Sequence, residues 1–151
     1  MSNRFRLGIV LRLREMAEET ARIELGHALD AHQQAVAAVQ AAQGRAGSEQ
    51  RWLGELQHRP SEARELQSAV LAVDTAQRAI AVAQEKLGHA TDALFQARRS
   101  LAEATRQREV VERLRDRFLA AERREMERRD AIAMAEIAST KHAVRAARER
   151  S

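Results

Sequence analysis

Several residue types that most functional sites need are scarce or missing in this chain. Its 151 residues include no Cys and no Tyr, one Trp, three Phe and one Pro. The lack of Cys excludes disulfides and thiolate metal sites. So few aromatic side chains can hardly line the concave pocket of a small-molecule enzyme. The composition therefore argues against catalysis, and with a single Pro it permits long uninterrupted helices.

Long hydrophobic runs are also missing. The apolar run near the N-terminus covers residues 7–11 and stops at Arg12, which is too short for the hydrophobic region of a signal peptide. No later run approaches the length of a membrane span. We therefore expect a cytoplasmic protein.

A heptad repeat occupies the middle of the chain, from Leu66 to Phe118. Apolar residues recur there at spacings of three and four, which is the a/d pattern of a coiled coil. One row is aliphatic and the other is alanine, and alanine lets two helix backbones approach closely. The pattern therefore predicts a slim two-helix packing. The aliphatic row is Leu66, Val73, Ile80, Leu87, Leu94 and Leu101, and the alanine row is Ala69, Ala76, Ala83, Ala90, Ala97 and Ala104.

The only proline, Pro60, separates two helical patterns. Before it, apolar residues predict an amphipathic helix over residues 5–56, with a looser register at Arg14, Glu18 and His32. Gly44 and Gly47 weaken this helix, and a short new helix could begin at Ser48. A turn is expected at 57–61, with Ser61 as the N-cap of a second helix over 61–148.

A chain that folds back near residue 60 would place residue i opposite roughly residue 120 − i. The heptads end near Phe118, where the first helix would run out. We therefore expect an all-α fold: a long antiparallel two-helix coiled-coil hairpin with an overhanging C-terminal helix, forming a single domain over residues 1–151. Such a hairpin would be monomeric alone, and a parallel dimer is the competing arrangement.

Three acid–histidine pairs have spacings found in metal sites: Glu24–His27, Glu55–His58 and Glu85–His89. Di-iron bundles need two Glu-x-x-His pairs on long helices together with two further glutamates. Here one pair adjoins the helix-breaking Pro60, and only two long helices are expected. Phosphate-binding loops are absent as well. We therefore expect no metal, no cofactor and no small-molecule substrate.

The C-terminal third is rich in arginine, with eleven basic and eight acidic residues from Val111 to Ser151. Basic zippers carry an almost acid-free run before their heptads. Here the arginines follow the heptads and alternate with acids, which is typical of a solvated helix. The pattern argues against nucleic-acid binding, although a basic rod associated with nucleic acid stays an alternative.

An apolar group lies near the expected turn and includes Trp52, Leu53 and Leu56. It could complete the core of the hairpin. It could equally form an exposed contact for a partner.

Two stretches carry a resemblance to a known family. The first runs from Phe5-Arg6-Leu7 into Val10-Leu11-Arg12-Leu13-Arg14, and the second runs from Glu112-Arg113-Leu114-Arg115-Asp116-Arg117 to an ending at residues 130–138. Together they resemble the FliJ family, the small coiled-coil proteins of the flagellar type III export apparatus. The aromatic-rich pattern of the family is largely replaced by Ala, so a related injectisome stalk protein is also possible.

The resemblance implies a non-enzymatic stalk and chaperone component. Its partners would be the hexameric export ATPase, the regulator of that ATPase, the export gate and escort chaperones, at the inner membrane. The residues implied for the ATPase ring are Arg12, Arg14, Arg113, Arg117 and Phe118. Trp52, Leu53, Leu56 and Val70 are the residues expected at the export gate or a chaperone. A structural coiled-coil scaffold is the alternative.

Overall fold

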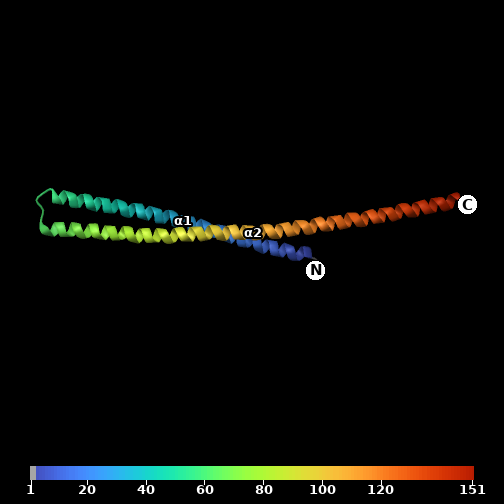
Figure 1. Cartoon of the computed structure of the whole chain (residues 1–151), viewed down its shortest axis with the longest axis horizontal. Coiled ribbons are helices and arrows are strands. Elements are labelled where there is room, and N and C mark those ends of the chain that lie inside the picture. The colour runs from blue at the N-terminus through green and yellow to red at the C-terminus, as the bar shows by residue number, and fades with distance from the viewer. Residues whose placement is uncertain (1–2) are drawn as a thin grey trace. The chain divides into compact units, whose positions relative to one another are not determined.

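Two α-helices joined by a short turn make up the chain (Figure 1). The computed structural model describes residues 3–151, with side chains from Arg6 onward. Helix α1 spans Asn3–Gln57 and helix α2 spans Ala63–Glu149. The described residues include no strand, and the two helices pack against each other. The all-α helical hairpin expected from the heptads is thereby confirmed.

The chain divides into two compact units. Unit 1 comprises Met1–Met16 and Arg106–Ser151, and unit 2 comprises Ala17–Thr105. Unit 2 contains the turn and the helix segments on either side of it. Unit 1 contains the start of α1 and the C-terminal part of α2.

The seam of unit 2 is built from small side chains. Ala69, Ala76 and Ala83 are all buried, and Ala69 is 0% exposed. Val39 and Ala42 of α1 cluster with Ala83, and aliphatic residues of α2 at 80 and 87 pack against them. Residue 39 therefore lies near residues 80–83, in agreement with the antiparallel register expected from the sequence. The alanine row is what allows the two backbones to lie close together.

The turn is closed by Ser61, but not as the expected N-cap. Its single hydroxyl proton is shared between the backbone carbonyls of Leu56, at 2.9 Å, and Arg59, at 3.2 Å. The Leu56 oxygen lies in the last turn of α1, where carbonyls lack intrahelical partners, and Arg59 lies in the turn that follows. Helix α2 begins two residues later, at Ala63. Ser61 therefore terminates the first helix, and the N-cap expectation was wrong.

Helix α1 runs without a break through Gly44 and Gly47, and no separate helix begins at Ser48. The Ser48 hydroxyl donates instead to the Gly44 carbonyl at 3.1 Å, one turn back along the same helix. Ala42 and Ala46, which lie among these residues, are buried in the seam. Packing therefore outweighs the low helix propensity of glycine in this segment.

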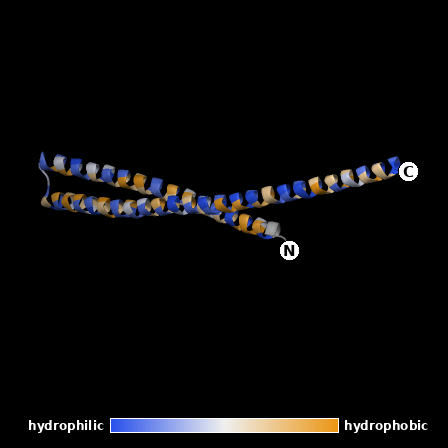
Figure 2. Cartoon of the chain, turned by 45° about the vertical axis from the view of Figure 1, so that its right-hand side comes forward, coloured by the Kyte–Doolittle hydropathy of each residue, from blue (hydrophilic) through white to orange (hydrophobic). Residues whose placement is uncertain are grey.

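Unit 1 contains a short paired region and a long unpaired one. Leu11 of α1 and Val111 of α2 are buried, and the Arg14 guanidinium donates a 2.6 Å hydrogen bond to the Gln107 side-chain oxygen. Because α2 has 87 residues and α1 has 55, α2 continues beyond its partner. Every residue from Met126 to Arg145 is exposed, and apolar and polar turns alternate there (Figure 2).

No helix among residues 3–151 is long and apolar enough to cross a membrane.

Candidate partner-binding surfaces

The residues expected at the ATPase ring all lie in unit 1. Arg12 and Arg14 come from α1, and Arg113, Arg117 and Phe118 come from α2. Both groups belong to the same compact unit although about 100 positions separate them in sequence. The four arginines are exposed, whereas Phe118 is half-buried. Phe118 lies seven residues after the buried Val111, so it continues the seam.

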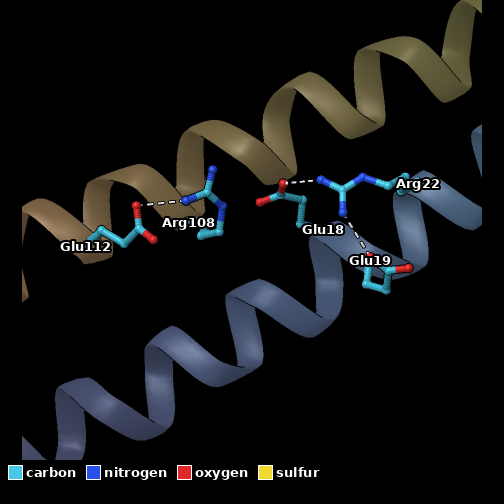
Figure 3. A network of polar contacts seen from close by, with 5 residues as sticks. All are labelled: Glu18, Glu19, Arg22, Arg108 and Glu112. Atoms are coloured by element: carbon cyan, nitrogen blue, oxygen red, sulfur yellow. Dashed lines mark hydrogen bonds and ion pairs between the residues drawn. The ribbon is translucent and has the colours of Figure 1, made fainter.

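Several arginines on α2 in this unit already have acidic neighbours. Arg108 pairs with Glu112 at 2.7 Å (Figure 3), and Arg113 approaches Glu109 at 3.7 Å. The Arg113–Glu109 pair is exposed, and exposed ion pairs contribute little to stability, so a partner can replace it at small cost. Within residues 6–151, by contrast, Arg12 and Arg117 form no ion pair.

Further along α2, Glu125 accepts hydrogen bonds from two arginines. Its carboxylate lies 3.0 Å from Arg128 and 3.2 Å from Arg129. The hydrogen bond from Arg128, followed by that from Arg129, lowers the pKa of the Glu125 carboxyl below its ordinary value. This alternation of acid and arginine on one exposed helix fits a solvated surface, as the sequence indicated.

Replacing Arg128 and Arg129 by glutamine is expected to raise the Glu125 pKa toward its ordinary value. Glutamine removes the positive charges that favour the ionised carboxylate. Because the folded-state pKa is lowered, the stabilising contribution is present above the unfolded pKa and is lost as pH falls through the folded pKa. An NMR titration of the Glu125 side-chain carbonyl would measure the change. An unchanged Glu125 pKa in this variant would contradict the assignment.

A buried carboxylate in α1 lies at a position that looked like an interruption in the sequence. Glu18 is buried, and its carboxylate accepts a 2.8 Å bond from Arg22, which also bonds Glu19 at 2.9 Å (Figure 3). Glu18 is seven residues after Leu11 and three before the buried Ala21, so it occupies the seam. A charged group at a seam position reduces stability but can specify register.

The residues expected at the export gate lie near the turn, in unit 2, and differ in exposure. Trp52 is 38% exposed and Val70 is 53% exposed, Leu53 is half-buried, and Leu56 is 1% exposed. Leu56 therefore belongs to the interior of the hairpin end and not to its surface. Sequence reasoning missed Leu71, which is exposed and lines a shallow groove with Leu66 and Val70.

The three acid–histidine pairs do not form a metal site. No group of three or more His, Cys, Asp or Glu side chains in the described part of the chain could hold a metal ion. Only the Glu85–His89 spacing gives a contact, at 3.8 Å along one turn of α2.

Comparison with known proteins identifies the family. The family model described as flagellar FliJ protein matches residues 2–147, which is nearly the whole chain. No curated protein and no solved structure matches. The FliJ proteins are structural components of the flagellar export apparatus and are not known as enzymes. The chain therefore belongs to the FliJ family and is a component of the flagellar export apparatus.

Proposed function

We propose that this chain is a stalk that binds the hexameric export ATPase through unit 1, with Arg12, Arg14, Arg113, Arg117 and Phe118 at the contact. The observation that supports this function is that four exposed arginines, two from each helix, belong to one compact unit. Their guanidinium groups can bond carboxylates or backbone carbonyls in a ring. The contact would promote ring assembly or couple hydrolysis to the export gate.

We assign the other partners to the turn region of unit 2. There Trp52 and Val70 offer apolar surface to the export gate or to an escort chaperone, Leu53 borders them, and Leu56 lies in the interior of the hairpin end. Both contacts would place the chain in the cytoplasm, at the inner membrane, with the regulator of the ATPase nearby. The chain alone would be monomeric, which light scattering would test.

The arginine contact predicts a loss of ATPase stimulation. Replacing all four arginines by glutamine is expected to weaken binding to the cognate export ATPase about 100-fold, since each removed charge contributes roughly 0.5–1 kcal/mol. Hydrolysis measured against stalk concentration would report this, and the binding of the native chain should weaken as salt is raised.

A matched control variant removes the same number of positive charges from unit 2. Arg45, Arg51, Arg64 and Arg98 are exposed arginines of unit 2, and their replacement by glutamine should leave stimulation nearly unchanged. An equal loss of ATPase stimulation in both variants would show that only the net charge of the chain matters. Native stimulation by the unit 1 variant would contradict the proposed contact.

A further inference from the structure

The paired region of unit 1 carries more exposed apolar surface than a helix pair needs for its own packing. Val10 and Leu13 on α1 and Val110 and Leu114 on α2 are 39–59% exposed. Single exposed apolar residues are ordinary, but a contiguous group often marks an interaction surface. Whether these four residues form one group depends on which side of the helix pair each of them occupies.

The buried seam residues fix those sides. On an α-helix, the residues one before and three after a given residue fall on one flank, and those one after and four after fall on the other. Around Leu11, Val10 and Arg14 therefore share one flank of α1, while Arg12 and Glu15 lie on the opposite flank.

The same rule applies to α2. Around Val111, Val110 and Leu114 share one flank, while Glu112 and Arg115 lie on the other. Gln107, four residues before Val111, belongs to the flank of Val110 and Leu114.

The hydrogen bond between the helices joins the two apolar flanks. Arg14 donates to Gln107 at 2.6 Å, so the flank of Arg14 on α1 and the flank of Gln107 on α2 face the same way. Because the helices are antiparallel, residues before Arg14 lie beside residues after Gln107. Val10 therefore lies beside Val110 and Leu114, with Leu13 extending the group outward. These four residues are here named the apolar flank.

The opposite flank carries both acids and arginines, whereas the charged residues beside the apolar flank are arginines. Three arginines border the apolar flank. Arg6 lies one turn before Val10, Arg14 lies one turn after it, and Arg117 lies three residues after Leu114. The acids of the paired region, Glu15, Glu109, Glu112 and Asp116, lie outside it. Those on α2 contact other arginines, namely Arg113, Arg108 and Arg115. The apolar flank is thus bordered by arginine and free of acid.

We infer that the apolar flank receives an acidic amphipathic helix of the partner, and that unit 1 binds the export ATPase from this one side. An apolar strip along two helices with basic borders fits a third helix that has apolar residues between acidic ones. This inference rests on the proposed function and narrows it, because Arg14 and Arg117 then belong to the contact while Arg12 lies on the opposite flank.

Photocrosslinking with the full-length chain and the cognate export ATPase tests which flank of unit 1 contacts the ATPase. A benzophenone amino acid at Val10 or Leu114 is expected to crosslink to an acid-rich helix of the ATPase, identified by mass spectrometry. The same probe at Glu15 or Glu112 should crosslink at least tenfold less. Equal crosslinking from both flanks, or crosslinks from Val10 and Leu114 only to a second copy of this chain, would overturn the inference.

A pair of variants gives a second measurement. Val110→Ser with Leu114→Ser is expected to weaken ATPase binding about 100-fold, roughly tenfold for each lost apolar contact. Val82→Ser with Ile23→Ser removes side chains of similar exposure from unit 2, and it should change affinity less than twofold. Circular dichroism would establish that both variants keep their helices. Equal affinities of the two variants would also overturn the inference.

The two proposals can fail separately. Stimulation of the ATPase with crosslinks from both flanks would contradict the one-sided contact and leave the stalk function standing. Absence of stimulation and of crosslinks at every position would contradict the stalk function, and the one-sided contact with it.

Discussion

Replacing Leu56 by alanine is expected to lower the free energy of unfolding by about 3 kcal/mol. Leu56 is 1% exposed and is the only large side chain among the described residues that is almost completely inaccessible. Truncation removes its buried methyl groups and leaves a cavity at the closed end of the hairpin. Urea denaturation followed by circular dichroism would measure the change.

Leu71→Ala is the matched control for this prediction. Leu71 lies near the same end of the hairpin but is 65% exposed, so its truncation should change the unfolding free energy by less than about 0.5 kcal/mol. If the two variants unfold at the same urea concentration, the end of the hairpin does not depend on Leu56. If only Leu56→Ala is destabilised, gate-binding defects in that variant must be corrected for stability.

The heptads predicted the fold because one physical pattern dominates the second helix. Leu66 to Phe118 places an apolar residue at nearly every third or fourth position, and a single proline marks where the chain can reverse. These two features predicted an antiparallel register near 120 − i, with a parallel dimer as the competing arrangement. The buried alanines at 69, 76 and 83 agree with that reasoning.

Local capping and seam composition were harder to predict. Ser61 matches the residue preference of an N-cap, yet its hydroxyl bonds a carbonyl of the preceding helix. Glu18 looks polar in sequence, yet it occupies the seam with Arg22 as its partner. Both contacts are short-range in sequence, five residues from Ser61 to Leu56 and four from Glu18 to Arg22. Residue preference alone did not indicate which of the nearby groups each side chain contacts, nor that Glu18 is buried.

The sequence predicted that the candidate residues share one end of the hairpin, but it did not predict which flank of the helix pair each of them occupies. Their role in binding stays a prediction. The antiparallel register brings Arg14 and Arg117 into one unit, as the sequence implied. Which flank each residue occupies depends on the phase of both helices about Leu11 and Val111. The rotation of each helix follows from which residues are buried, and the Arg14–Gln107 hydrogen bond shows which flanks face the same way.

Replacing four glycines inside the helices by alanine is expected to raise the free energy of unfolding by about 3 kcal/mol in total. Gly26, Gly44, Gly47 and Gly88 all lie in unbroken helix, and none has a positive φ. An added Cβ meets nothing within 4 Å at three of them, and at Gly47 it meets only the Arg51 side chain at 4.0 Å. Each alanine should therefore contribute its helix propensity, about 0.8 kcal/mol, without steric cost.

The opposite substitution on the same helix provides the control. Ala41 is exposed on α1 close to Gly44, so Ala41→Gly should destabilise the chain by about as much as Gly44→Ala stabilises it. Urea denaturation of the single and combined variants would show both effects, and distant sites should add. A stabilised variant that still stimulates the export ATPase would show that flexibility at the glycines is not needed for the stalk. A stabilised variant that loses stimulation would instead show that function requires the weaker helix.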